Sequence, residues 1–330
     1  KMVLLIDIAG DVENAVAEAA SATVRLANLR EAEGFIAVSA EARKRFWADR
    51  SRTAAIAAHT NAFKVNEDVV IPLEKLADYS EGVERINIEH SIRNKLRIVE
   101  AIAAYLAEPL REVEQGATHQ TTEEFAAIAA AKQATARAHL ERVQGRWRGI
   151  LEHLDDAVAE HRDLLDKQAA AKRTLNDTLL SLLLRRDLRV SFRAEVERPL
   201  KEIFGGGEFS AVRAKFDAIH QHILSSRLFV ALHMHAGDGN VHTNIPVNSN
   251  DYSMLQEADG IVDRVMALAR QLGGVISGEH GIGITKYRWL DPQKANDFAA
   301  YKARIDPNGH FNRGKLLPGG GLDRAYTPSF

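Results

Sequence analysis

Two short segments rich in histidine and glycine carry the strongest chemical signal in the sequence. Residues 235–242 read His-Ala-Gly-Asp-Gly-Asn-Val-His, and residues 278–283 read Gly-Glu-His-Gly-Ile-Gly. Because glycine lets the backbone turn tightly, His235 and His242 can direct their rings toward one place. Glu279 on the second turn could complete a set of two imidazoles and one carboxylate. Three protein ligands with open positions are typical of a catalytic metal site, since structural zinc sites close with four.

An ordinary role in turns is the alternative for these histidines. Loop histidines often do no more than hydrogen-bond to nearby groups, and we interpret His233 in that way. The glycine run at 205–207 is likewise interpreted as a turn. It follows a helical pattern, whereas a phosphate-binding glycine loop should follow a strand and open a helix.

The composition of the 330 residues excludes several other kinds of chemistry. The chain has no cysteine, which rules out disulfides, thiolate metal ligands and cysteine nucleophiles. Its net charge of −2 gives no global attraction for nucleic acid or an anionic membrane. No apolar run reaches the roughly 18 residues that span a bilayer, and the N-terminus is not a signal peptide. We therefore expect a cytoplasmic protein, or one bound peripherally to the inner face of a membrane, without nucleic acid as a partner.

Three regions that differ in sequence pattern must position these motifs, and a loose tail follows them. We expect their boundaries at 1–90, 91–226, 227–318 and 319–330. In the first region, apolar runs and helical periodicity predict strands at 2–8, 35–38 and 69–72 and helices at 11–31, 41–58 and 73–82. Because an apolar strand pattern begins at residue 2, we expect the chain to start inside a fold, as a fragment would.

The third region has the pattern of a hairpin followed by helices. Alternating apolar residues predict paired strands at 228–233 and 241–247 around a turn at 236–239. Helical periodicity predicts the two helices at 252–272 and 291–305.

The middle region is rich in alanine, leucine, glutamate and arginine, and it reads as helical. Thr-Thr-Glu-Glu at 121–124 predicts a capping box that opens a long helix. Behind it a seam recurs at heptad spacing, through Leu140, Trp147, Leu154, His161, Gln168, Leu175 and Leu182. We interpret the region as an antiparallel helical arm, with an ordinary amphipathic bundle packed on the same core as the alternative. The predicted fold is therefore α+β, an antiparallel sheet with covering helices, interrupted by a long helical insertion.

Three ordered motifs resemble one protein family. Residues 235–242, 276–283 and 306–315, the last reading Asp-Pro-Asn-Gly-His-Phe-Asn-Arg-Gly-Lys, are similar to the C-terminal domain of FAD-linked oxidases. The resemblance is to the vanillyl-alcohol oxidase superfamily, in its D-lactate, glycolate and D-2-hydroxyglutarate dehydrogenase branch. Phe-Trp-Ala-Asp-Arg at 46–50 and Val-Ile-Pro-Leu at 70–73 match as well. The similarity covers about residues 1–88 and 228–318.

The resemblance implies a divalent metal held by His235, His242 and Glu279, with zinc, manganese or iron as the ion. It also implies that His280 takes the proton of the substrate hydroxyl. A metal chelated by a 2-hydroxy acid lowers the pKa of that hydroxyl, and an imidazole can accept a proton near neutral pH. The hydride from C2 would pass to the flavin.

The resemblance also implies substrate- and flavin-binding positions. Arg50 would hold the substrate carboxylate, and Lys64 and Asn244 fall near substrate-binding positions. Asn312 and Lys315 lie in the stretch that would approach the flavin. The alternatives are a surface helix arginine at position 50 and a solvated loop lysine at position 64.

The function implied is that of an FAD-dependent D-2-hydroxy-acid dehydrogenase that passes electrons to an acceptor other than NAD. Its partners would be a small 2-hydroxy acid, its own flavin domain and, through the helical arm, a second copy of the chain. The family's glycine-rich pyrophosphate loop is absent from these residues, so we expect them alone to bind FAD weakly and to be inactive.

Two departures from the family are visible. Arg313 stands where the family usually has proline, and the helical stretch is roughly a hundred residues longer than in relatives. Two other classes of function remain open. One is a metal-dependent hydrolase that uses the same two histidines and glutamate. The other is an interaction module, in which the helical arm binds a partner and the motifs are vestigial.

Overall fold

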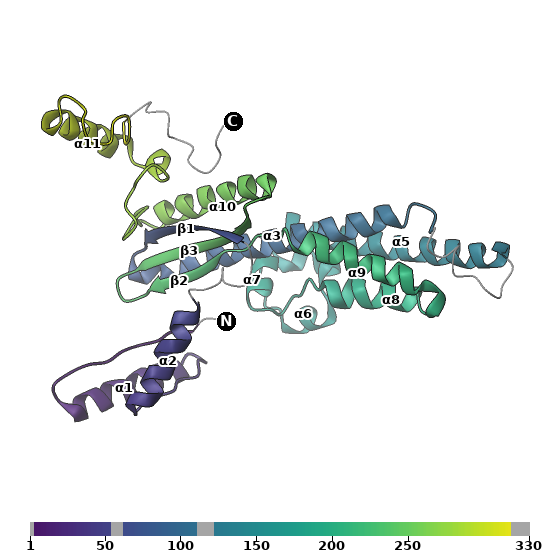
Figure 1. Cartoon of the computed structure of the whole chain (residues 1–330). Coiled ribbons are helices and arrows are strands. Elements are labelled where there is room, and N and C mark those ends of the chain that lie inside the picture. The colour runs from purple at the N-terminus through teal and green to yellow at the C-terminus, as the bar shows by residue number, and fades with distance from the viewer. Residues whose placement is uncertain (1–2, 54–61, 111–121, 318–330) are drawn as a thin grey trace. The chain divides into compact units, whose positions relative to one another are not determined.

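The computed structural model describes residues 3–53, 62–110 and 122–317. The chain divides into two units, Lys1–Thr60 and Asn61–Phe330, and Figure 1 labels the elements of both. Within the described ranges, every helix is too short or too polar to cross a membrane.

The first unit contains two helices, α1 (Glu13–Asn28) and α2 (Ala40–Thr53). They confirm the helices predicted at 11–31 and 41–58, although residues 54–58 lie outside the described residues.

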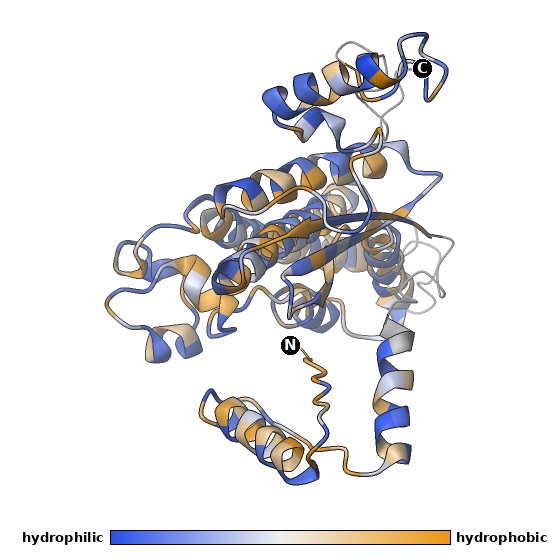
Figure 2. Cartoon of the chain, turned by 90° about the vertical axis from the view of Figure 1, so that its left-hand side faces the viewer, coloured by the Kyte–Doolittle hydropathy of each residue, from blue (hydrophilic) through white to orange (hydrophobic). Residues whose placement is uncertain are grey.

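The strands predicted at 2–8 and 35–38 are wrong for the residues that the structure describes. Residues 3–8 and 35–38 have no regular structure, and residue 2 lies outside the description. Val3 and Val38 are 93% and 87% exposed, and Figure 2 shows the apolar N-terminal run outside any helix or strand. A strand needs a neighbouring strand for its backbone hydrogen bonds. The described part of this unit contains no such neighbour.

The second unit is organised around a three-stranded antiparallel sheet. Its strands are β1 (Ala62–Val70), β2 (Ala231–His235) and β3 (Asn240–Asn248), in the order β1-β3-β2. The hairpin of β2 and β3 confirms the predicted pair of strands and its turn. Gly239 in the turn has φ +76°, and a Cβ there would collide with the carbonyl oxygen of Ile71. The turn therefore requires glycine at this position.

One face of the sheet is apolar. Val65 and Val69 of β1 share it with Val241 and Ile245 of β3, because side chains alternate along a strand. These residues form one hydrophobic core with side chains of α3 (Leu76–Tyr105) and α10 (Tyr252–Gln271). The structure thus confirms an antiparallel sheet covered by helices.

The helix predicted at 73–82 is much longer than expected. A short 3₁₀ turn, η2 (Leu73–Lys75), leads into α3, which continues through Gly82 to Tyr105. Leu268 of α10 packs where a Cβ of Gly82 would lie. Close packing between the two helices, rather than helix propensity, explains a glycine inside α3.

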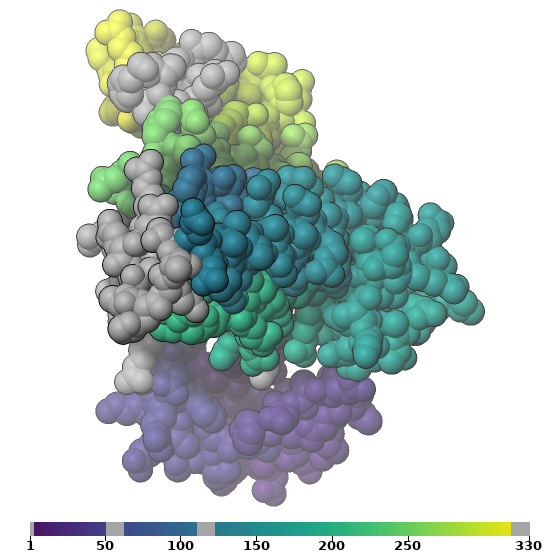
Figure 3. All heavy atoms as spheres, turned by 90° about the vertical axis from the view of Figure 1, so that its right-hand side faces the viewer, coloured from purple at the N-terminus to yellow at the C-terminus, as the bar shows by residue number. Residues whose placement is uncertain are grey.

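A second hydrophobic core lies in the helical region, where helices and the turns between them supply its side chains. The C-terminal half of α3 packs there against α5 (Thr122–Glu152), whose Leu140, Trp147 and Ile150 are buried. The other helices are α6 (Lys167–Lys172), α7 (Leu179–Leu184), α8 (Arg198–Ile203) and α9 (Ser210–Leu224). Short turns η3 (Val158–Glu160), η4 (Arg162–Leu164) and η6 (Gly207–Phe209) and a π-helical turn η5 (Arg193–Glu197) connect them. Figure 3 shows the outer surface of this bundle in teal.

The long seam predicted from Leu140 to Leu182 is only partly correct. α5 begins at Thr122, Thr121 lies outside the described residues, and the helix ends at Glu152. Beyond it the chain folds into short turns and helices, and Leu175 is 96% exposed. Side chains that bond to nearby backbone compete with a continuous helix, and here Asp166 caps α6 while Thr178 caps α7.

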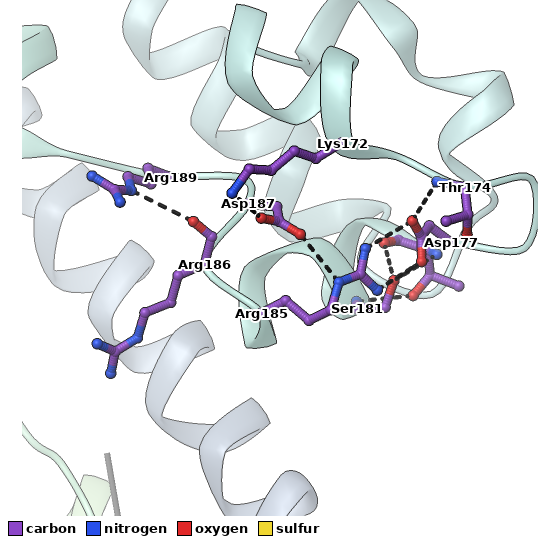
Figure 4. Close-up of polar contacts among 9 residues, drawn as sticks. Lys172, Thr174, Asp177, Ser181, Arg185, Arg186, Asp187 and Arg189 are labelled. Carbon is purple, nitrogen blue, oxygen red and sulfur yellow. Dashed lines mark hydrogen bonds and ion pairs between the residues drawn. The ribbon is translucent and has the colours of Figure 1, made fainter. Parts of the chain in front are cut away.

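A network of ion pairs stabilises this short-helix region (Figure 4). Asp177 accepts two hydrogen bonds of 2.8 Å from Arg185 and one of 2.7 Å from the backbone of Thr174. Arg185 also contacts Asp187, which Lys172 contacts in turn.

The predicted domain boundaries stay predictions, and α3 runs without interruption across the first of them, at residue 90.

The last helices agree with their predictions. α10 ends before Gly273, whose φ is +78°, and α11 spans Pro292–Ile305. The glycine run at 205–207 leads from α8 into η6, whose first residue is Gly207, so it is a turn between helices, as predicted. The tail predicted from residue 319 lies outside the described residues.

Candidate metal and substrate site

The second face of the sheet is polar and carries four of the candidate residues, His235, His242, Asn244 and Lys64. In the middle of β3, His242 lies opposite Asp68 of β1 and His233 of β2. His235 of β2 lies opposite Asn240 of β3. This pair is two residues along from the pair of His233 and His242, so it is on the same face of the sheet. The rings of His235 and His242 have their centroids 5.9 Å apart. Antiparallel pairing therefore brings the two histidines together, with the glycine turn setting the register.

Glu279 reaches this pair from the segment that follows α10. Its Oε1 lies 3.6 Å from Nε2 of His235, and its Oε2 lies 3.5 Å from Nε2 of His242. The ligand atoms of the three residues all lie within 4.8 Å of one another. Donors held at about 2.0–2.1 Å by a tetrahedral zinc ion lie about 3.3–3.4 Å from one another. The spacing and the donor types thus fit one divalent ion.

The group is open on one side. The side chain of His242 is 12% exposed, whereas that of Glu279 is 55% exposed. Burial lowers the pKa of His242 from its ordinary value, an effect that outweighs the opposing charge of Glu279. The neutral imidazole, which is the form that binds metals, is favoured. An ion held here would have free positions for oxygen atoms of a ligand.

Asp68 lies at the centre of a buried network behind Glu279. It is fully buried, and its Oδ2 accepts the backbone N–H of Gly278 at 2.8 Å, of Glu279, and of His280 at 3.2 Å. Lys286, also buried, donates to the backbone oxygen of Asp68 at 2.7 Å and to its Oδ1. Burial alone would raise the pKa of Asp68, but these hydrogen bonds hold it well below its usual range. A charged carboxylate therefore fixes the turn that carries Glu279 and His280.

His280 lies between the carboxylate of Asp68 and the group formed by His235, His242 and Glu279. Its Nδ1 is 3.5 Å from Oδ1 of Asp68, and its ring centroid is 5.1 Å from that of His242. A proton on Nδ1 directed at Asp68 leaves Nε2 to accept a proton. The side chain is 32% exposed, so an incoming ligand can reach it.

Lys64 and Asn244 share the polar face with His242. Asn244 is buried next to it along β3, and Lys64 is partly exposed on β1 opposite Pro246. The side-chain oxygens of Asn244, Asn66 and Asn240 are buried and, among the described residues, have no hydrogen-bond partner. Buried polar atoms are normally paired, so this face has unused capacity for a polar ligand.

The other candidates are held by local contacts. Arg50 lies on α2 of the first unit, where its guanidinium stacks 5.6 Å from the ring centroid of Trp47. Asn312 and Lys315 lie in the turn after α11, and Lys302 donates to the backbone oxygens of both, at 2.8 and 3.1 Å. Asn312 and Lys315 are not among the residues that the structure brings into the histidine group.

Asp68 and Lys286 belong to the site but are not among the residues predicted from the sequence. The signal was available: Glu67 and Asp68 precede Val69 and Val70, and carboxylates inside an apolar strand must find partners. Because the predicted strand began at Val69, both acids were left outside it. Lys286 carried no comparable signal, since its burial depends on the fold.

Comparison with known proteins connects this site to a family. The family described as "FAD linked oxidases, C-terminal domain" matches residues 1–107 and 209–316. Its two segments flank the helical region from α5 to α8.

Curated relatives match a shorter part of the chain. The glycolate oxidase subunit GlcD of Escherichia coli (strain K12) is 40% identical over 95 residues, 28% of this chain and 19% of its own length. A mitochondrial D-lactate dehydrogenase [cytochrome] of Arabidopsis thaliana is 32% identical over 98 residues, which are 28% of this chain and 17% of the relative. A mitochondrial D-2-hydroxyglutarate dehydrogenase of Danio rerio is 38% identical over 88 residues, which are 26% of this chain and 16% of the relative. The matched segment thus spans less than a fifth of each relative.

Proposed function

Because the chain belongs to the FAD-linked oxidases through their C-terminal domain, we propose that it forms the substrate- and metal-binding part of an FAD-dependent D-2-hydroxy-acid dehydrogenase. The observation that carries the proposal is the convergence of His235, His242 and Glu279 on one point, with His280 beside them. The relatives named for glycolate, D-lactate and D-2-hydroxyglutarate support the substrate class.

His235, His242 and Glu279 would hold a divalent ion, which is zinc, manganese or iron. When bound, such an ion lowers the pKa of a hydroxyl that it coordinates. His280 accepts the hydroxyl proton through Nε2, while Asp68 keeps the ring oriented and stabilises the imidazolium. Asp68 and Lys286 act as positioning residues, because they touch the turn rather than the substrate.

The substrate would lie on the polar face of the sheet. Asn244 and Lys64 are on this face, and Asn244 offers a buried oxygen without a partner. The ammonium of Lys64 suits a carboxylate, and in our proposal Arg50 binds the carboxylate as well. Asn312 and Lys315 approach the flavin, which would be bound mainly by a separate flavin domain and would accept the hydride.

The metal is tested first, on the purified chain of 330 residues. Metal content and zinc affinity are measured for Glu279→Gln and for the control His222→Ala, which removes an exposed histidine from α9. Loss of a ligand should weaken binding by more than the roughly 10- to 100-fold that outer hydrogen-bond partners contribute. The control should leave binding at this group unchanged. Equal affinity in both variants would refute the metal group.

The base is tested in the full-length protein that contains the flavin domain. Adding a D-2-hydroxy acid should bleach the flavin, and His280→Ala should slow the bleaching by about 10²- to 10⁴-fold with the flavin still bound. A wild-type rate in this variant would remove His280 from the mechanism. Ester or amide hydrolysis without flavin would instead favour a metal-dependent hydrolase.

A further inference from the structure

A second group of metal-ligand type lies in the helical region, just beyond the end of α5. Nδ1 of His153 and Nε2 of His161 both contact Oδ2 of Asp156, at 2.7 and 3.2 Å. The two rings stack with centroids 4.1 Å apart. One donor atom from each residue lies within 4.8 Å of the others. The same holds for His235, His242 and Glu279, here called the His235 group, and the new set is called the His153 group. These residues lie outside the two segments that match the family.

The backbone holds this group in place from both sides of Asp156. Three backbone hydrogen bonds tie the segment to the start of α7: Leu180 N–H to Leu154 O at 2.8 Å, Leu179 N–H to Asp156 O at 3.4 Å, and Val158 N–H to Asp177 O at 2.9 Å. The side chains of Leu154 and Val158 are buried in the helical core. The three ligand residues are therefore presented by a frame that is formed without a metal, which reduces the cost of ordering them on binding.

The charges around the group favour a cation. Residues 152–163 contain the acids Glu152, Asp155, Asp156, Glu160 and Asp163 and a single arginine, Arg162. Asp155 is engaged by Arg85 of α3, at 2.6 Å, which ties the segment to that helix. Both histidines direct a ring nitrogen at Oδ2 of Asp156, so the three side chains already face one another.

We propose that His153, Asp156 and His161 bind a zinc ion that closes the turn between α5 and η3. Two imidazoles and a carboxylate suit zinc and other borderline divalent ions, and exclude a preference for calcium or magnesium. Zinc replaces the two hydrogen bonds to Oδ2, and the ligands separate to the spacing of about 3.3–3.4 Å that tetrahedral zinc requires. His161 is 19% exposed and His153 40% exposed, so the fourth position is open to water. The site joins the end of the long helix to the short-helix region.

The inference is tested by counting zinc in the 330-residue chain, with both groups treated separately. The wild-type chain should bind two equivalents, one for each group. The pair His153→Gln/His161→Gln should bind one, and so should the pair His235→Gln/His242→Gln. Glutamine keeps a polar partner for Asp156, and the control His222→Gln should leave the count unchanged.

Two outcomes overturn the proposal. One is a wild-type count in the folded His153→Gln/His161→Gln chain. The other is no zinc on the His235→Gln/His242→Gln chain, a measurement in which the His153 group is intact and its folding is not in question. Failure of the His235 group appears separately, as one equivalent in the wild type that only the His153 and His161 substitutions remove. Zinc should also raise the Tm of the His235→Gln/His242→Gln chain, in which only the His153 group is intact, and adding Asp156→Asn to that chain should remove the rise.

Discussion

Replacing Asp68 with asparagine removes one charge from the buried pair that Asp68 forms with Lys286. The carboxylate accepts three backbone N–H groups as well as the ammonium, and both side chains are almost completely shielded from solvent. Removing one partner of a buried ion pair costs about 3–5 kcal/mol. Here Glu67, also buried, stays 3.4 Å from Nζ of Lys286 and compensates part of the remaining charge. The new side-chain amide would also direct its N–H₂ group toward backbone donors unless it turns. We therefore expect the free energy of unfolding to fall by about 3 kcal/mol, the lower end of this range.

The same substitution should weaken metal binding at the His235 group. Asp68 does not touch the ion in our proposal, but it fixes the turn that carries Glu279. Loss of such a partner typically costs about 10- to 100-fold in metal affinity. The double variant Asp68→Asn/Lys286→Met should not recover the stability, because it takes the ammonium away from the buried carboxylate of Glu67. Nor should it recover the metal affinity, since the backbone N–H groups still lack their carboxylate.

Urea unfolding followed by circular dichroism measures the stability, and zinc titration measures the affinity. The matched control is Asp78→Asn, which breaks the exposed pair of Asp78 with Lys75. An exposed pair contributes about 0–1 kcal/mol, so this control should unfold almost like the wild type. If Asp68→Asn costs no more than Asp78→Asn, the buried network does not hold the turn, and the reasoning is refuted.

Two further predictions concern local structure. Gly239→Ala should destabilise the chain by at least about 1–2 kcal/mol, because residue 239 has a positive φ and a Cβ would meet Ile71; Gly237→Ala, where a Cβ meets nothing within 4 Å, should cost less in the same urea experiment. Arg185 and the backbone N–H of Thr174 hold the pKa of Asp177 well below its usual range, so its contribution to stability is present above the unfolded pKa of about 3.9 and is lost as pH falls through the folded pKa. The difference in unfolding free energy between wild type and Asp177→Asn should therefore shrink below about pH 4, and a difference that grows with acidification would contradict this assignment.

Local features of the sequence were sufficient for several elements. The hairpin of β2 and β3 follows from alternating apolar residues on either side of a glycine turn, and each of these signals acts over a few residues. α10 and α11 likewise have their own caps, at Asp251 and Asp291. The proximity of His235 and His242 follows from the same hairpin, which made these two candidates predictable from residue types and spacing.

Other features depended on partners far along the chain. The apolar runs at 3–8 and 35–38 have strand character but no neighbouring strand in the described part of their unit, so they form none. α3 continues past Gly82 because α10 packs against it, and the heptad seam stops at Glu152 because local caps and ion pairs outcompete a longer helix. The hydrophobic pattern of a sequence indicates which face of a segment is apolar. The length of a helix and the pairing of a strand depend on the elements that pack against that face.

The site shows the same division. The residue types of His235, His242, Glu279 and His280 are enough to indicate metal and proton chemistry, because few residues can supply imidazole and carboxylate donors. Only the tertiary structure brought Asp68 of β1 and Lys286 together behind them. A carboxylate and an ammonium tolerate full burial only when each compensates the other, and that compensation comes from contacts more than two hundred residues apart in sequence.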